Sequence, residues 1–305
     1  MNTFRHISMA LPVLLLLAAC NNDDELQPGT VNIVTSISGP QTRAPQLDET
    51  GAGNFETKVD NLQLAIYGGK TDPMRTSYTV GTPSLYWADV VATAGQADTY
   101  TFAAWYNGDD ALDLVANPSF NVAEATNKDL LLATPATVSV EQTVTLKFSH
   151  AMHKLVVNLS YGDGFDDLDK TQVKVTPVNM NAAATIDVKE GTVTAGEASA
   201  SDGTYPTVTM GSATSCSFIL APQKLTTGAE WLDIALPNGM KFVFKVPASF
   251  NDAKNESVSL TQLSSGQTLT LNLTITKTGV SLTTGQISAW GNQGSYTGNV
   301  DYVYE

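Results

Sequence analysis

The sequence predicts an all-β protein built from β-sandwiches. Valine, threonine, isoleucine, tyrosine and phenylalanine recur in short runs separated by Gly, Pro, Asn and Asp, which is the pattern of strands and turns. Apolar and polar residues alternate with a period of two in Leu62–Ile66 and in Leu269–Ile275, so each of these strands has one apolar face. Such strands form sheets that pack face to face, with their outer faces in water.

The expected strands follow one another along most of the chain. They are Thr30–Ile37, Asn61–Tyr67, Thr99–Tyr106, Thr137–Ser149, Lys154–Tyr161, Gln172–Pro177, Ala184–Val188, Pro206–Met210, Ser217–Leu220, Trp231–Leu236, Met240–Val246, Thr268–Thr276 and Gln286–Trp290. Helical periodicity is weak, with one or two turns expected at most in Pro118–Leu132. The stretch Gly191–Ser215 is rich in small polar residues and is expected to be a long loop or a hairpin excursion.

Length and a break in the alternation predict two domains in tandem after a signal peptide. A mature chain of roughly 260–285 residues is long for one sandwich and comfortable for two. At Phe148–Lys154 a segment with two histidines separates two alternating apolar runs. We therefore expect an N-terminal β-sandwich over residues 44–150 and a C-terminal β-sandwich over residues 151–305.

The N-terminus carries a secretory signal. Leu11–Ala19 is an apolar run behind the basic residues Arg5 and His6, and Cys20 follows it directly. A permanent membrane-spanning helix needs ~20 apolar residues, so this shorter run indicates a cleaved signal. Small residues before a cysteine are what a lipoprotein signal peptidase requires. We expect residues 1–19 to be a lipoprotein signal peptide and Cys20 to be acylated; the alternative is a plain signal peptide with an incidental cysteine.

A second processing signal follows the first expected strand. Thr42–Pro45 contains Arg43, one of only three arginines in the chain, and a protease could cut between Arg43 and Ala44. An exposed arginine in a polar linker is also common, so this alternative stays open. The acidic run Asn21–Glu25 is either a solvated tether or a surface-export tag. Together the signals predict a propeptide, residues 20–43, that carries the first strand and is removed on maturation.

The net charge and the cysteine content exclude two classes of partner and an intrachain disulfide. The chain has 16 basic and 30 acidic residues, a net charge of −14, and cutting after Arg43 changes this only to −13. Nucleic acid and anionic membrane surfaces repel such a protein. With Cys20 acylated, Cys216 is the only thiol left, so no intrachain disulfide can form. Cys216 lies in an apolar strand and is expected to be a small buried hydrophobe.

No catalytic residue, metal site or cofactor is expected. His150 and His153 lie three apart near strands, so they would point to opposite faces and could not readily share a metal. No nucleophile elbow is present. The acidic turn Asp163–Asp169 could hold calcium, but it lacks the bidentate glutamate of a helix–loop–helix site and is better explained as a solvated turn. The aromatic residues Trp87, Trp105 and Trp231 could stack on sugars, although such residues are more often in the core.

Four features together resemble the fimbrillin family, the subunits of type V pili. They are the lipoprotein start, the strand that ends before Thr42–Pro45, the run Val144–Leu155, and the stretch Gly279–Trp290. The resemblance implies two transthyretin-like β-sandwich domains, and transport to the outer membrane as a lipoprotein. It also implies cleavage between Arg43 and Ala44 by an arginine-specific gingipain-type protease, and polymerisation with other fimbrial subunits at the cell surface. The surface that such fimbriae would adhere to is unknown from the sequence.

The resemblance also implies that one strand leaves and another replaces it. Val31, Ile33 and Ile37 share one face of the strand that cleavage would release, and its loss would open a groove with an apolar floor. The donor would be the tail Gly298–Glu305, in which Val300, Tyr302 and Tyr304 alternate; the alternative is that this tail completes its own domain. A second interpretation of the whole chain is a surface-anchored, glycan-binding β-sandwich lipoprotein.

Overall fold

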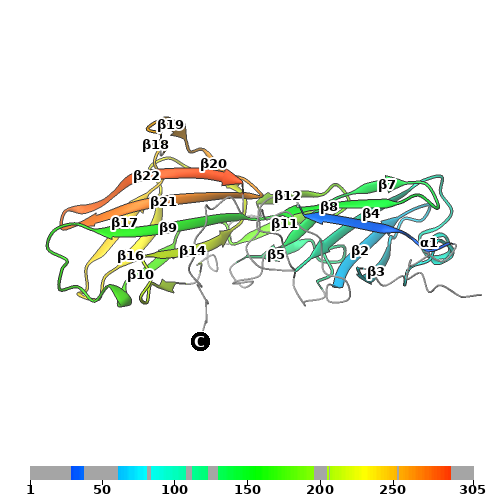
Figure 1. The fold of residues 1–305 in the computed structure, drawn as a ribbon, viewed down its shortest axis with the longest axis horizontal. Helices are drawn as coiled ribbons and strands as arrows, with labels where there is room; N and C mark the ends of the chain where they lie inside the picture. The colour runs from blue at the N-terminus through cyan, green and yellow to red at the C-terminus, as the bar shows by residue number, and fades with distance from the viewer. Residues whose placement is uncertain are drawn as a thin grey trace, which may run out of the picture.

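The computed structural model describes residues 29–37, 61–80, 84–107, 112–122, 130–195, 205, 207–252 and 254–289. Strands account for most of this part of the chain, which confirms the all-β sandwich prediction. The molecule is elongated, and most strands run near its long axis (Figure 1). The regular helical elements among these residues are α1 (Trp87–Ala94) and a 3₁₀ turn at Lys170–Gln172.

One seven-stranded sheet organises the half of the molecule that contains α1. Its order is β1-β8-β6-β4-β2-β3, with β7 paired to β4. The strands are β1 (Ile33–Ile37), β2 (Asn61–Tyr67), β3 (Met74–Thr79), β4 (Tyr100–Tyr106), β6 (Leu131–Thr134), β7 (Ala136–Val138) and β8 (Val144–His150). Alternate residues of these strands form a hydrophobic cluster, called here the N-terminal core, which extends from Val31 to Phe148. Helix α1 packs into it through Trp87, Val90 and Ala94.

Two four-stranded sheets face each other in the other half, with orders β14-β9-β21-β22 and β13-β10-β16-β17. Their strands are β9 (His153–Tyr161), β10 (Lys174–Pro177), β13 (Val208–Thr209), β14 (Ser215–Leu220), β16 (Glu230–Ala235), β17 (Lys241–Lys245), β21 (Gln267–Thr276) and β22 (Gly279–Ala289). Both sheets contribute to a second cluster, called here the C-terminal core, with Leu271 from one sheet and Trp231 from the other. Two sheets with one shared apolar interior make a β-sandwich.

Three small sheets complete the described strands. One has the order β12-β11-β5, and the others are the pairs β15–β20 and β18–β19. Their strands are β5 (Ser119–Asn121), β11 (Ala183–Asp187), β12 (Thr192–Ala195), β15 (Gln223–Lys224), β18 (Ser249–Asn251), β19 (Ser257–Ser259) and β20 (Gln262–Leu263). The Phe250 ring of β18 lies so close to Gly285 of β22 that a Cβ there would come within 2.6 Å of it. Glycine is therefore required at this position for the hairpin to pack on β22.

The expected division at Phe148–Lys154 coincides with a change of sheet. The chain bends at Ala151–Met152, and the strands on either side, β8 and β9, belong to different sheets. However, the C-terminal core also takes in Trp105 and Phe120, and β5 pairs with β11 across the middle of the molecule. The boundary between residues 150 and 151 therefore stays a prediction.

Several elements differ from expectation. Helix α1 was not predicted, and Ser119–Asn121 is a strand where a helical turn was considered; residues 123–129 lie outside the described part. Strand β22 begins at Gly279, before the expected Gln286. The stretch expected as a loop or hairpin excursion contains two short strands, β12 and β13, on either side of residues that are not described.

Candidate functional site

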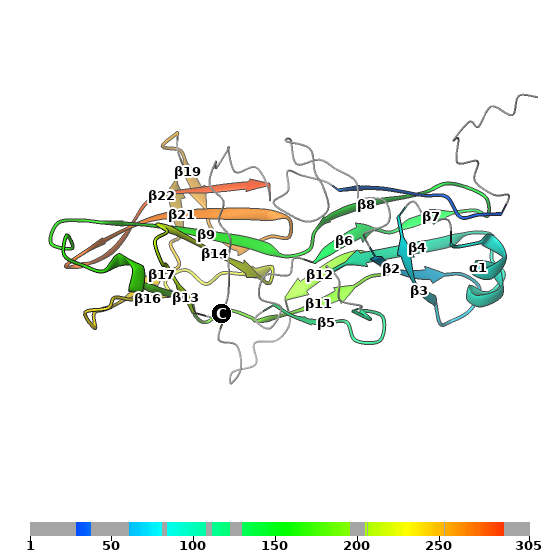
Figure 2. The ribbon, with the colours of Figure 1, turned by 60° about the horizontal axis from the view of Figure 1, so that its bottom comes forward.

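The first strand lies at the end of the seven-stranded sheet, along one side of β8 (Figure 2). The pairing is parallel, with Ile33 opposite Val144, Thr35 opposite Leu146, and Ile37 opposite Phe148. Because opposite residues of a parallel pair point to the same face, these six side chains all point inward. Among the described strands β1 pairs only with β8, so it is an edge strand that a single ladder joins to the sheet.

The inward face of this strand is fully part of the N-terminal core. Val31, Ile33 and Ile37 are 1%, 8% and 3% exposed, whereas Val34 on the outward face is 48% exposed. Thr35 is also buried on the inward face, although the sequence analysis did not single it out. Each buried Val or Ile contributes ~1.5–3 kcal/mol, so the three together contribute roughly 5–9 kcal/mol.

A second set of hydrogen bonds holds the residues just before β1. The Val31 N–H donates to the Leu85 carbonyl at 2.9 Å, and the Trp87 N–H donates to the Gly29 carbonyl at 2.8 Å, on either side of a bridge between Thr30 and Tyr86. Tyr86 is the N-cap residue of α1, and its side chain makes no capping bond. The Gly29 carbonyl therefore accepts a hydrogen bond from the Trp87 N–H, for which α1 itself contains no acceptor.

Asn32 joins the two parts of the segment. Its carbonyl accepts from the Val144 N–H at 2.8 Å, and its side-chain amide donates to the Thr143 hydroxyl at 3.1 Å. Residues 29–37 are thus antiparallel to Leu85–Trp87 and then parallel to β8. Taking this segment away would leave backbone groups on both neighbours without partners, above a floor of apolar side chains. Such a groove can accept another extended segment through backbone hydrogen bonds and alternate side chains.

The two histidines near the end of β8 are structural. His150 and His153 are 5% and 1% exposed, and His153 Nδ1 donates to the Ser264 carbonyl at 2.9 Å. Burial lowers the pKa of His153 to about 4, although the hydrogen bond to Ser264 opposes this shift. The ring is therefore neutral at neutral pH. Within the described part of the chain, no group of three or more His, Cys, Asp or Glu side chains could hold a metal ion.

The remaining candidates from the sequence lie in the core or in solvated turns. Cys216 is 1% exposed on β14, as predicted, and burial raises its pKa to about 12. In the turn Asp163–Asp169 the Phe165 ring is buried, and Asp169 accepts a hydrogen bond from the Thr171 N–H at 3.1 Å.

The interpretation of three tryptophans as sugar platforms is wrong. Trp87, Trp105 and Trp231 are 3%, 2% and 0% exposed, so no ring face is available to a ligand. Trp87 meets the rings of Tyr100 and Phe102 edge-on, with centroids 5.9 and 5.8 Å away. The tryptophans fill the two cores because large aromatic rings bury the most apolar area per residue.

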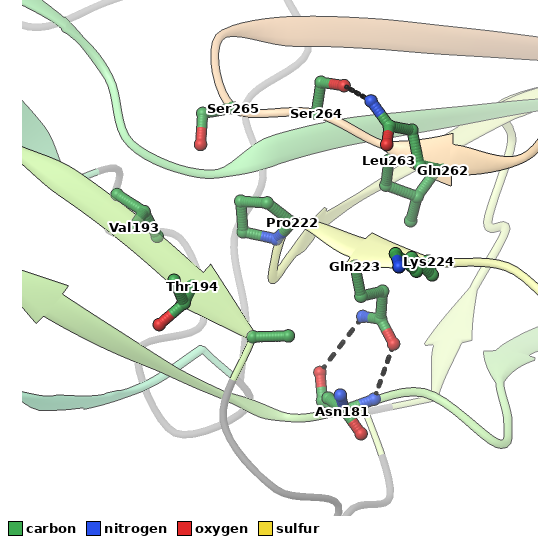
Figure 3. Close-up of a pocket in the computed structure, with 11 residues that line it drawn as sticks. Asn181, Val193, Thr194, Pro222, Gln223, Lys224, Gln262, Leu263, Ser264 and Ser265 are labelled. Carbon is green, nitrogen blue, oxygen red and sulfur yellow. Dashed lines mark hydrogen bonds between the residues drawn. The ribbon is translucent and has the colours of Figure 1, made fainter.

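A shallow, open pocket of about 600 Å³ lies between β12 and the β15–β20 pair (Figure 3). The Gln223 side chain closes one side: its amide oxygen accepts from the Asn181 N–H at 2.9 Å, and its nitrogen donates to the Asn181 carbonyl at 3.3 Å. Among the described residues that line the pocket, Lys224 is the only charged one. These residues therefore offer no acid–base pair.

Several predicted site residues lie outside the described residues. They are Cys20, Arg43 and Ala44 near the N-terminus and Val300, Tyr302 and Tyr304 near the C-terminus. Acylation, cleavage and strand donation at these positions stay predictions. Among the residues that the structure does describe, no helix has the length and apolar character needed to cross a membrane.

Several solved structures are similar to this one. A Bacteroides ovatus protein provisionally assigned to cell adhesion is 16% identical, with a TM-score of 0.54 over 86% of this chain and 97% of that chain. A Bacteroides uniformis protein with the same provisional assignment is 17% identical, with a TM-score of 0.50 over 77% and 93%. The tip fimbrial protein Mfa3 of Porphyromonas gingivalis, with C-terminal truncation, is 10% identical, with a TM-score of 0.43 over 76% and 94%.

The sequence itself identifies the family. No curated protein sequence matches the chain. The profile of the fimbrillin-like family matches residues 42–290, which is most of the sequence and includes both cores except for the first strand. The resemblance noted in the sequence is therefore confirmed, and the chain belongs to the fimbrillin-like family.

Proposed function

We propose that the protein is a structural, non-enzymatic subunit of cell-surface fimbriae, and that it assembles with other subunits by protease-triggered exchange of its first strand. Family membership supports a fimbrial role, and two proteins with the same fold are provisionally assigned to cell adhesion. The single observation that carries the mechanism is the placement of β1. It is buried on one face, yet it is an edge strand that one ladder joins to the sheet.

The strand is also placed where a cut can release it. Arg43 follows Ile37 by six residues, so cleavage there leaves the whole strand on the N-terminal fragment. That fragment, residues 20–43, is then held only by noncovalent contacts. A donor strand from a neighbouring subunit gains the same apolar floor and the same backbone partners on β8 and Leu85–Trp87.

The rest of the pathway follows from the two processing signals. We propose that residues 1–19 are removed as Cys20 is acylated, so that the precursor is anchored in the outer membrane. An arginine-specific protease then cuts between Arg43 and Ala44, and the subunit joins a fibre outside the cell. In this proposal residues 44–150 form the acceptor sandwich, and residues 151–305 form a second sandwich that ends in the donor tail.

The mature N-terminus tests this proposal most directly. Mass spectrometry of fimbriae sheared from cells should find Ala44 as the first residue. The Arg43→Ala variant should remain a lipid-bearing monomer in the membrane fraction. The matched control is Arg75→Ala. Arg75 is an exposed residue of β3 that lies far from the cleavage site in the sequence, and its guanidinium pairs with the Asp113 carboxylate at 2.8 Å. This control should still form fibres.

Two results would contradict the proposal. Fibres that contain uncut subunits would show that strand release is unnecessary. A cut protein that stays monomeric at high concentration, with an intact tail, would show that the open groove does not recruit a neighbour.

A further inference from the structure

The end of the sequence repeats the pattern of the strand that fills the groove. Gly29–Ser36 reads GTVNIVTS, and Gly298–Glu305 reads GNVDYVYE. The glycine and both valines occupy the same places in the two octapeptides, and an aspartate takes the place of its amide counterpart, Asn32. We propose that the tail of a second copy enters the groove in one register, with Gly298 in the place of Gly29 and Glu305 in the place of Ser36. This inference rests on the proposed strand exchange and adds to it the register of the donor.

The first position of the octapeptide requires glycine. Gly29 has φ +86°, a left-handed backbone conformation that other residues adopt at a cost. The conformation aims the Gly29 carbonyl at the Trp87 N–H, at the start of α1. In the proposed register Gly298 adopts the same conformation and restores this bond. A register shifted by two residues would put Val300 or Tyr296 at this position. Either shift would force a residue with a Cβ into a backbone conformation that favours glycine.

The inward side chains of the tail keep the alternation of the leaving strand in this register. Val300 takes the place of Val31, which is 1% exposed. Tyr302 and Tyr304 take the places of Ile33 and Thr35, and both rings are larger than the side chains they replace. Ile37, the next inward residue of the leaving strand, has no counterpart within Gly298–Glu305. Its space, beside Phe148, is therefore open to the ring of Tyr304.

The outward side chains distinguish this register from the others. Val303 takes the exposed place of Val34, and Asp301 takes the place of Asn32, where its carboxylate can accept a hydrogen bond from the Thr143 hydroxyl. Glu305 takes the place of Ser36, directly opposite Lys147 of β8. Lys147 is exposed, and it is the only charged residue that points outward from β8. Two copies of a chain with a net charge of −14 repel each other. A carboxylate opposite this lysine therefore favours the proposed register over one in which the tail is shifted along β8.

Disulfide trapping in fibres tests the register. In the proposed register residue 303 of one copy lies opposite residue 145 of the next, at a spacing that a disulfide can bridge. The variant Val303→Cys with Thr145→Cys, cut at Arg43 and oxidised, should give a ladder of covalent multimers. The matched controls Asp301→Cys with Thr145→Cys and Glu305→Cys with Thr145→Cys report slips by two residues and should give little cross-linking. Cys216 is buried and does not compete.

Each other outcome of this experiment overturns part of the inference. Stronger cross-linking in either control would show a different register. A covalent 303–145 bond confined to monomers would show that the tail fills its own groove rather than that of a second copy. Absence of fibres from the cut chain without these substitutions would instead refute the strand exchange itself.

A charge exchange gives an independent measurement. Lys147→Glu should slow fibre formation several-fold at low salt, and Glu305→Lys in the same chain should restore most of the rate. Lys241→Glu, which changes an exposed lysine on β17, is the matched control and should have little effect. Equal slowing by Lys147→Glu and Lys241→Glu would show that only net charge matters, and would overturn the proposed pairing.

Discussion

Replacing Ile37 with alanine should weaken the packing of the first strand against the rest of the N-terminal core. Ile37 is 3% exposed, and its partner in the parallel ladder is Phe148. The substitution removes three buried carbon groups, each of which contributes ~0.8 kcal/mol, and it leaves a cavity that adds to the loss. Ile37 is the last residue of an edge strand, where the surroundings can relax, so we expect a total of about 2–3 kcal/mol.

The same loss should appear in two measurements. In the uncut chain, the free energy of unfolding in urea should fall by about 2–3 kcal/mol with little change in the slope. In the chain cut at Arg43, the same loss of free energy corresponds to a roughly 30- to 150-fold higher dissociation constant for the cut fragment. A fluorescent label on residues 20–43 would report this release as a drop in anisotropy, and fibres should form sooner.

Val34→Ala provides the control on the same strand. Val34 is 48% exposed, so its truncation should change the free energy of unfolding by less than about 0.5 kcal/mol. Equal effects of Val34→Ala and Ile37→Ala would refute the reasoning, because the strand would then not bury the face that contains Val31, Ile33 and Ile37. Faster release without faster fibre formation would show that strand departure does not limit assembly.

Three further predictions concern the C-terminal core. Gly285→Ala should lower the melting temperature, because its Cβ would come within 2.6 Å of the Phe250 ring. Gly162→Ala tests for a general glycine effect, because its Cβ would come no nearer than 3.3 Å to another residue. Because the pKa of His153 is about 4 in the folded chain and ordinarily near 6.5, the unfolded state binds more protons between these values. Stability should therefore fall by up to ~3 kcal/mol as the pH drops from about 6.5 to about 4, and urea titrations should show a flatter profile for His153→Gln. Cys216 should react with a thiol reagent only after unfolding, since burial raises its pKa to about 12; rapid labelling of the native chain would contradict its placement.

The sequence predicted best the strands in which large apolar side chains occur at every second position. Leu62–Ile66 and Leu269–Ile275 alternate clearly, and both lie inside the strands β2 and β21. Strand β22 was expected only from Gln286, because it is an edge strand and most of its side chains are partly exposed on both faces. The strands of two or three residues, such as β15 and β20, are too short for a period to appear.

Helix α1 shows why some of the candidate site could not be predicted. It has only eight residues, and its N-cap residue, Tyr86, lacks the side-chain oxygen that usually marks a helix start. A partner for the first helix N–H, that of Trp87, comes from the carbonyl of Gly29, far away in the sequence. The parallel pairing of β1 with β8 is a long-range contact of the same kind. Local patterns gave the inward residues Val31, Ile33 and Ile37 but not the strand against which they pack.

The structure also bears on why a fibre of such subunits would persist. The leaving strand and the proposed donor present the same pattern to the same floor, so exchanging one for the other changes the free energy little. Persistence must then come from the barrier to withdrawing a buried strand rather than from a large equilibrium gain. That barrier includes the three apolar side chains in the core, the ladder with β8, and the carbonyl that caps α1. Because the Gly29 carbonyl bonds to α1 while Ile33–Ile37 pair with β8, a strand pulled from either end must break both sets of contacts before it is free. Cleavage at Arg43 breaks none of these contacts, so it permits exchange without itself emptying the groove.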